Sequence, residues 1–202
     1  MAVKYSEEPQ GTEAWLQERV GLLTASRFAK AMSKGKGRQD LLHELRFQRR
    51  IGGYGNSPAS DETYKSAAMV RGNRLEPEAR LVAGMMLGEE IKEVGLALND
   101  DYPGIGASLD GLIGDTIGIE IKCPLGPTHD TYLKQARLPA VYKWQVHGQM
   151  LVCALEAVWF MSYHPDDEEV LLIKIERDHD LLDELVAGLK QFFMDLEQLE
   201  QA

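Results

Sequence analysis

Two acids and a base lie close together in the stretch SLDGLIGDTIGIEIKCP, residues 108–124. Isoleucine occupies every second position from 117 to 121, which is typical of a β-strand that buries one face. If this strand buries its isoleucines, Glu120 and Lys122 point together from the opposite face. Asp110 is predicted to end the preceding strand of the same hairpin, which brings a second carboxylate close to this pair.

These residue types suit metal-assisted chemistry. Two carboxylates from neighbouring strands can bind a hard cation that keeps several waters, as Mg²⁺ does, and the carbonyl of Ile121 is placed to add an oxygen ligand. Lys122 beside that cation could orient or deprotonate a water, or hold a phosphate oxygen, and either role suits hydrolysis of a phosphodiester. In the alternative interpretation, Glu120 and Lys122 are a solvent-facing pair and residues 110–111 are a plain turn. Two carboxylates buried together without a cation would repel each other, so the arrangement favours a metal.

The elements that position these residues follow from hydrophobic periodicity and from turn residues. Helices are predicted over residues 12–21, 24–33 with Thr24 as the N-cap, 40–53 with Asp40 as the N-cap, and 61–87 with a kink or restart at Pro77. Strands are predicted over residues 90–98, 104–110, 116–124, 156–164 and 169–177, with a turn at 111–115. Further helices are predicted over residues 128–137, 140–153 and 181–199.

This order of elements predicts an α/β or α+β fold with a mixed central β-sheet flanked by helices. At 202 residues, the chain is expected to be a single domain spanning 1–202. Within it we expect N-terminal helices over 12–51, a core over about 61–177 and a C-terminal helix over 181–199.

The charge distribution is uneven along the chain. The net charge of −10 argues mildly against a nucleic-acid partner. Residues 27–50, however, hold eight Lys or Arg and two acids, whereas residues 166–200 hold twelve acids and three bases. A basic front and an acidic back would guide a polyanion to one face, although solvated helix faces explain the same pattern.

Several classes of site find no support in the sequence. The five histidines form no H-x-H or HExxH pattern, which argues against a zinc hydrolase, and GKGR lacks the frame of a P-loop, so ATP is not expected. Two cysteines are too few for a four-cysteine iron–sulphur cluster. The sequence shows neither a membrane-spanning run nor a signal peptide, which favours the cytoplasm.

Four segments in order resemble a known family. GASLDGLI followed by GIEIKCP resembles the PD-(D/E)xK nuclease superfamily, and closely its phage lambda exonuclease branch of viral recombination exonucleases. WLQERVGLLTAS, RGNRLEPEAR and AVYKWQVHGQM resemble further motifs of that branch, so the resemblance spans roughly residues 15–165. Position 109 departs from the superfamily label, because it holds Leu in place of Pro. The resemblance implies a restriction-endonuclease-like core.

The resemblance also implies roles for individual residues. Asp110 and Glu120 would bind the metal with the Ile121 carbonyl. Lys122 would activate or orient the water, and Glu76 would hold a second metal or its waters. The residues implied around the 5′-phosphate and DNA are Arg19, Ser26, Ser108, Gln145 and Tyr142. Apart from the resemblance, Lys34, Lys36 and Arg38 lie in a basic, glycine-rich segment that is predicted to be a loop and could contact DNA phosphates.

Ordinary structural roles compete with these assignments. Arg19 could pair with an acid or compensate a helix dipole, and Ser26 could be a first-turn residue. Glu76 before Pro77 could be a capping carboxylate. Gln145 and Gln149 could form a surface stripe, in which only Gln145 matches the family motif. The lysines of the basic loop could simply be solvated.

As a function, the resemblance implies a Mg²⁺-dependent 5′-to-3′ exonuclease, with Mn²⁺ as a substitute. It would degrade one strand of duplex DNA with a 5′-phosphate end to 5′-mononucleotides and leave a 3′ overhang for phage-type recombination. A ring-shaped homotrimer, a single-strand annealing protein as partner and the cytoplasm of a bacterial host are also implied. Two alternatives remain: a structure- or sequence-specific endonuclease on the same core, and a non-catalytic DNA-end-binding protein, against which the intact Asp110, Glu120 and Lys122 count.

Overall fold

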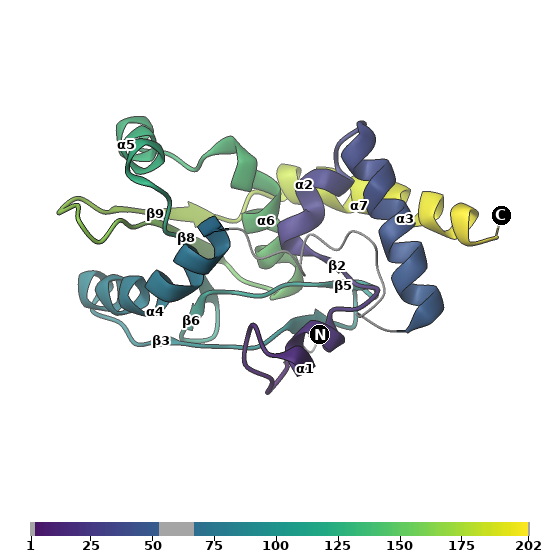
Figure 1. Cartoon of the computed structure of the whole chain (residues 1–202), viewed down its shortest axis with the longest axis horizontal. Helices are drawn as coiled ribbons and strands as arrows, with labels where there is room; N and C mark the ends of the chain where they lie inside the picture. The colour runs from purple at the N-terminus through teal and green to yellow at the C-terminus, as the bar shows by residue number, and fades with distance from the viewer. Residues whose placement is uncertain (1–2, 53–66, 202) are drawn as a thin grey trace.

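A mixed five-stranded sheet lies between helices at the centre of the computed structural model, which describes residues 3–52 and 67–201 (Figure 1). The strands, in spatial order, are β3 (Ile91–Lys92), β6 (Gly111–Ile113), β7 (Ile117–Lys122), β8 (Ala157–Ser162) and β9 (Leu171–Glu176). β7 and β8 pair in parallel, and the other neighbours are antiparallel. The predicted mixed sheet flanked by helices is confirmed.

The parallel pair in the middle of the sheet requires a crossover connection. It is formed by α5 (Gly126–Gln135), the short 3₁₀ turn η2 (Ala140–Tyr142) and α6 (Lys143–Val152). Ile119 and Ile121 of β7 pack on one face of the sheet against Ala79 and Ala83. The opposite face carries Glu120, which is 1% exposed because α6 lies over it, so the alternative interpretation of a solvent-facing pair is wrong for Glu120.

The helix that covers the isoleucine face is α4 (Ala67–Leu87). Its described part runs without a break through Gly72 and Pro77, so the predicted restart is wrong. The ring of Pro77 removes the donor for the carbonyl four residues earlier and crowds that carbonyl, but the apolar contacts of Ala79 and Ala83 hold the helix beyond it. The expected helical residues 61–66 lie outside the described part.

The hairpin is shorter than predicted. The strand expected over 104–110 ends early as β5 (Ile105–Gly106), which pairs in parallel with β2 (Leu23–Thr24). Residues 111–113, which were expected to be a turn, form β6, and only a tight turn with Gly114 at φ +57° remains. Gly111 permits this pairing, because a Cβ there would lie 2.3 Å from Cγ2 of Ile91.

The N-terminal part forms a second layer. β1 (Val3–Tyr5) pairs with β4 (Ala97–Asn99), α1 (Glu13–Glu18) begins at its N-cap Thr12, and η1 (Ala25–Arg27) leads into α2 (Phe28–Ala31). The last two elements, η1 and α2, take the place of the single helix predicted over 24–33.

The next helix, α3 (Lys36–Ile51), begins at Gly35, so residues 36–38 are helical and not a loop, and Asp40 is not an N-cap. As predicted, it ends at Gly52, which is left-handed at φ +61°. It packs on α7 (His179–Gln201), which crosses behind it in Figure 1. None of the helices in the described residues is long and apolar enough to cross a bilayer.

Candidate active site

The β6–β7 hairpin brings the two predicted metal ligands together. The backbone N–H of Asp110 donates to the Ile119 carbonyl (3.1 Å), and the Ile121 N–H donates to the Asp110 carboxylate (2.6 Å). The carboxylate of Asp110 therefore lies against β7, beside Glu120. Removal from water, and then the charges of Glu120 and Glu76, raise the pKa of Asp110 well above its usual range. Three carboxylates thus repel one another here.

Lys122 lies on the same face of β7 as Glu120, and its ammonium forms an ion pair with the Glu120 carboxylate. Burial opposes the charge on Lys122, but the charges of Glu120 and Asp110 outweigh burial and raise its pKa. The Nζ also lies 5.2 Å from the centre of the Tyr142 ring. The ammonium of Lys122 is thus placed beside the predicted metal ligands, where it could orient a water or hold a phosphate oxygen.

Two glutamines of α6 hold the Glu120 carboxylate. Nε2 of Gln145 donates to Oε1 (2.6 Å), and Nε2 of Gln149 donates to Oε2 and also to the Ser108 carbonyl (3.0 Å). Gln149 is fully buried, so the surface-stripe interpretation is wrong for it. Gln149 was not predicted to be a site residue, although its spacing of four from Gln145 places both side chains on one helix face.

Glu76 reaches the cluster from α4. Its carboxylate accepts a hydrogen bond from Nη2 of Arg80 (2.6 Å), whose Nε donates to the Asp110 carbonyl (2.7 Å) and whose Nη1 pairs with Glu93. Burial raises the pKa of Glu76, Arg80 offsets part of this, and Glu120 and Glu93 add to it. Arg80 was also missed in the sequence; its only signal is the spacing of four from Glu76.

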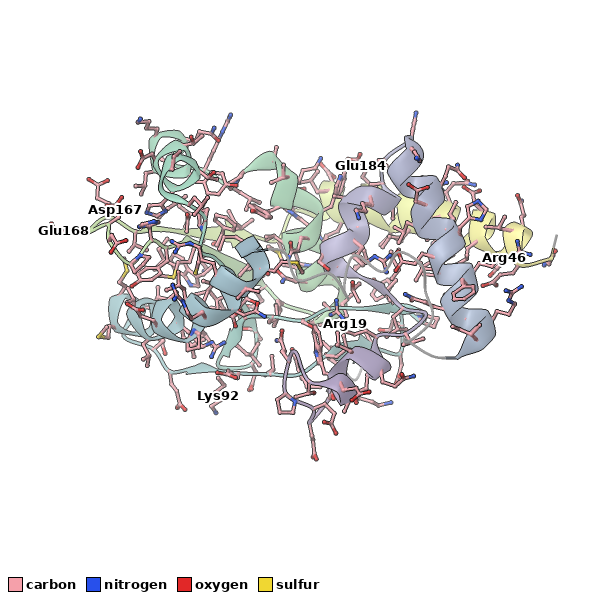
Figure 2. All side chains as sticks on the ribbon, in the orientation of Figure 1. Arg19, Arg46, Lys92, Asp167, Glu168 and Glu184 are labelled. Carbon is pink, nitrogen blue, oxygen red and sulfur yellow. The ribbon has the colours of Figure 1, made fainter. Side chains whose placement is uncertain are left out.

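A positively charged pocket lies next to the acids. Nη1 of Arg19 donates to Oγ of Ser108 (3.2 Å) and Nη2 to Oγ1 of Thr24 (3.5 Å), which in turn lies 3.3 Å from Oγ of Ser26. The guanidinium stacks over the Trp15 ring at 4.1 Å. Thr24 occupies the predicted N-cap position, now of the short η1, but its side chain contacts Arg19 and makes no capping hydrogen bond. The structure brings the predicted Arg19, Ser26 and Ser108 together, and Figure 2 shows Arg19 near the centre of the molecule.

One cleft of about 860 Å³ opens onto both the acids and this pocket. Its walls include Arg19, Ser26, Glu76, Arg80 and Asp110, with the N-terminal residues 5–11 along one side. A ligand in the cleft can therefore contact cationic and acidic side chains at once.

The donor set fits a hard divalent cation. Among the described residues no group of three or more His, Cys, Asp or Glu forms a closed metal cage. Asp110 and Glu120 with the Ile121 carbonyl instead offer a partial set of oxygens that leaves room for waters, as Mg²⁺ prefers. Oε1 of Gln149 is buried without a partner within the described chain, and a bound water would satisfy it. A cation would also relieve the repulsion between the carboxylates.

The predicted DNA-contact loop is divided by the structure. Arg38 points into the protein, where Nη2 binds Asp195 (2.6 Å) and Nε binds the Ala31 carbonyl (3.1 Å). Lys34 and Lys36 are exposed, and their contact with DNA stays a prediction.

The acidic and basic segments are not on opposite faces as expected. The acidic helix α7 lies beside the basic helix α3, and Asp195 and Glu200 pair with Arg38 and Arg49. The acidic loop between β8 and β9 does lie at the far end from α3: Figure 2 shows Asp167 and Glu168 there and Arg46 at the other end.

Comparisons with known proteins find similar structures and a matching family. The crystal structure of an alkaline exonuclease (LHK-Exo) from Laribacter hongkongensis is 38% identical, covers 94% of this chain and 95% of that chain, and has a TM-score of 0.84. The same values hold for its complex with dAMP. A phage-related exonuclease from Haemophilus somnus 129PT shares the fold at 15% identity, with 88% of this chain and 94% of that chain covered and a TM-score of 0.68. A search of the curated proteins finds no match.

The family model of the YqaJ-like viral recombinase domain matches residues 14–156, which is more than half of the chain. This match and the homology to an alkaline exonuclease over nearly the whole chain confirm the resemblance to viral recombination exonucleases. The chain therefore belongs to the YqaJ-like viral recombinase domain family.

Proposed function

We propose that this protein is a Mg²⁺-dependent 5′-to-3′ exonuclease that degrades one strand of duplex DNA. The observation that carries the proposal is one cleft that joins the acids around Asp110 to the cationic pocket around Arg19. Hydrolysis of a terminal phosphodiester needs both: oxygens for a cation at the scissile bond, and donors for the end that must be held. The homologous alkaline exonuclease binds dAMP, a deoxynucleoside monophosphate, which supports mononucleotides as products.

Asp110, Glu120 and the Ile121 carbonyl would hold Mg²⁺, and Glu76 would hold a second metal or its waters. When bound, the metal supplies charge stabilisation at the phosphate and lowers the pKa of its water. Glu120 is fixed by Gln145 and Gln149, which donate to its two oxygens. Lys122, with its raised pKa, holds the attacking water or a phosphate oxygen through its ammonium.

The pocket around Arg19 suits a terminal 5′-phosphate. Its guanidinium now binds the neutral hydroxyls of Ser108 and Thr24, which a phosphate can replace as the better acceptor. Ser26 adjoins through Thr24, and Tyr142 adjoins Lys122. A pocket that holds an end phosphate, together with a metal site for the neighbouring linkage, supports release of one nucleotide at a time from the 5′ end.

The wider setting follows from the same proposal. The 3′ overhang would enter phage-type recombination through a single-strand annealing protein in the cytoplasm of a bacterial host. A ring-shaped homotrimer would explain how a chain of net charge −10 binds DNA, because the basic surface need only line the channel. Lys34 and Lys36 are candidates for that surface. Mn²⁺ should replace Mg²⁺, and neither ATP nor an iron–sulphur cluster is required.

The deciding experiment compares linear duplexes with and without a 5′-phosphate against closed circular DNA, in Mg²⁺ or in EDTA. We expect digestion of the phosphorylated linear duplex alone, abolished by EDTA and by Lys122→Ala, with mononucleotide products. Cutting of the circle would instead favour the endonuclease, and binding of ends without turnover would favour a non-catalytic end-binding protein.

A further inference from the structure

The carbonyls of the segment that carries Asp110 are held by side chains, while the Asp110 N–H keeps its backbone bond to Ile119. Residues 108–110 lie between the bridge of Ala97 with Ala107 and the start of β6, outside any strand. Each of their three carbonyls accepts a side-chain N–H from a different part of the chain. The donors are Gln149 to the Ser108 carbonyl (3.0 Å), Gln10 to the Leu109 carbonyl (2.7 Å) and Arg80 to the Asp110 carbonyl (2.7 Å).

These bonds take the place of ladder bonds for backbone that enters the core. Leu109 is 1% exposed, and a buried carbonyl without a donor is costly. The three carbonyls are consecutive, so the three donors together restrict the path of the chain into Asp110. The Asp110 carboxylate then has only to meet the Ile121 N–H on β7.

Two of the donors also bind the acids of the site. Arg80 binds Glu76 and Gln149 binds Glu120, so each links the 108–110 backbone to a carboxylate from another element. Arg80 comes from α4 on one face of the sheet and Gln149 from α6 on the other. The backbone of residues 108–110 is therefore held by hydrogen bonds from both faces of the sheet.

Gln10 differs from these two, because both of its hydrogen bonds go to backbone carbonyls. Its Nε2 donates to Leu109 and to Val94 (3.0 Å), which ties the N-terminal segment and the β3–β4 connection to residues 108–110. The N-terminal segment is closely docked at this point: a Cβ on Gly95 would lie 2.3 Å from the Ser6 carbonyl oxygen. Gln10 itself is exposed along the cleft, so its substitution removes little core packing.

We propose that Gln10, Arg80 and Gln149 are positioning residues that fix the 108–110 backbone so that Asp110 meets Glu120 at the distance a divalent cation needs. The role of Asp110 rests on the proposed function, but the positioning itself does not. Gln10 provides the cleanest test of the three, since it contacts none of the acids through its two bonds.

The test replaces Gln10 by Met, which is similar in size but has no N–H to donate. The matched control is Gln17→Met: Gln17 is also exposed and also donates Nε2 to a backbone carbonyl, that of Gly52 (3.3 Å). For Gln10→Met we expect a kcat about tenfold lower and a Mg²⁺ concentration for half-maximal activity about tenfold higher. This is the smaller end of the ten- to hundredfold loss that is usual when a residue supporting a metal ligand is replaced. The KM for DNA ends should not change, and Gln17→Met should leave all three values at wild type.

A second readout needs no activity. Without DNA, Mg²⁺ should raise the unfolding temperature of wild type and of Gln17→Met at lower concentrations than it does for Gln10→Met. If Gln10→Met lowers the unfolding temperature but leaves the Mg²⁺ dependence unchanged, its role is only structural and the proposal is wrong. If wild type shows this Mg²⁺ response but no nuclease activity, the proposed function fails while the positioning stands.

The double variant Gln10→Met/Gln149→Met tests whether the two donors act on the same segment. Because both donors hold the same segment, their effects on Mg²⁺ half-saturation should be less than multiplicative, whereas Gln10→Met with Gln17→Met should be multiplicative. Arg80→Lys retains the charge but not the three-point geometry, and we expect a loss of about ten- to a hundredfold in Mg²⁺ affinity. Simple multiplicative behaviour of Gln10 with Gln149 would contradict a shared segment.

Discussion

The two ends of the cleft differ in how well their charges are balanced. At the acidic end, Asp110, Glu120 and Glu76 share one ammonium and one guanidinium and still raise the pKa of Asp110. At the cationic end, Arg19 is 8% exposed and is bound by hydroxyls and an aromatic ring. The acidic end thus holds repulsion that a cation relieves, whereas the cationic end is already in place for an anion. A bound metal would balance the charges of the acidic end, whereas at the cationic end a phosphate would only replace the hydroxyls that contact Arg19.

The largest effect is expected from Asp110→Asn, which tests the acidic end. Loss of a metal-binding carboxylate should lower kcat by about a thousandfold. The amide oxygen can still accept the Ile121 N–H, and the repulsion disappears, so the unfolding temperature in EDTA should rise or stay unchanged. Activity assays and thermal unfolding check both results.

The control for this variant is Asp115→Asn in the exposed turn of the same hairpin, which should change neither value. A fall in the metal-free unfolding temperature of Asp110→Asn would mean that the carboxylates do not repel as described.

Arg19→Ala should have the next largest effect, at the cationic end. Hydrogen bonds to a charged group contribute about 1.5–3 kcal/mol, so the KM for 5′-phosphorylated ends should rise about ten- to a hundredfold. Arg19→Lys should recover little of it, because an ammonium does not reproduce the planar fork. Equal losses on phosphorylated and hydroxyl ends would refute the role of Arg19 as a phosphate ligand.

The pH dependence of stability should separate the two ends further. The raised pKa values of Asp110 and Glu76 favour their protonated forms in the folded protein. The stability they contribute is complete below the unfolded pKa of about 4 and is lost as the pH rises through the folded values. The raised pKa of Lys122 adds stability that is lost only at strongly alkaline pH.

The metal-free protein should therefore become less stable between acidic and neutral pH, and Mg²⁺ should restore the loss. The difference in unfolding temperature between Mg²⁺ and EDTA is expected to grow with pH, at about 2–4 °C per kcal/mol. A difference that shrinks as the pH rises would contradict the description of the acidic end.

The smallest effect is expected for the exposed lysines Lys34 and Lys36. Lys36→Ala should weaken binding to duplex DNA without sequence preference, and it should reduce the slope of log affinity against log salt by about 1. Lys190→Ala on the exposed side of α7 is the matched control. Equal slopes for the two variants would remove Lys36 from the DNA surface.

The three central residues could be found from the sequence because they lie within 13 positions on one hairpin. Alternating isoleucines fix the face of Glu120 and Lys122, and the adjoining strand brings in Asp110. Arg19, Ser26 and Gln145 came from motif resemblance, and spacing alone would not have placed them together. Only the folded chain brings Arg19 and Ser26 into the cleft beside Asp110 and places Gln145 of α6 on Glu120.

The errors have physical causes of the same kind. Glycines at 35 and 37 suggested a loop, but Arg38 binds Asp195, 157 residues away, and the helix begins at Lys36. The sequence left open whether Glu120 faces water, because a sequence pattern does not reveal that α6 covers the second face of β7. Arg80 and Gln149 carried only a spacing of four as a signal, and the signal for Gln10 was weaker still, since its bonds reach 84 and 99 positions along the chain.

The packing around two glycines has a practical consequence for engineering this enzyme. Any side chain at 111 would collide with Ile91, and one at 118 would lie 2.9 Å from Leu155 and 3.1 Å from Leu109. Both glycines should therefore be kept in variant libraries that seek new substrate preferences, even though they lie close to Asp110 and Glu120 in the sequence. Diversity belongs at the exposed Glu7 and Pro9 on the rim of the cleft, whereas Gln10 beside them should be kept because it holds the Leu109 carbonyl.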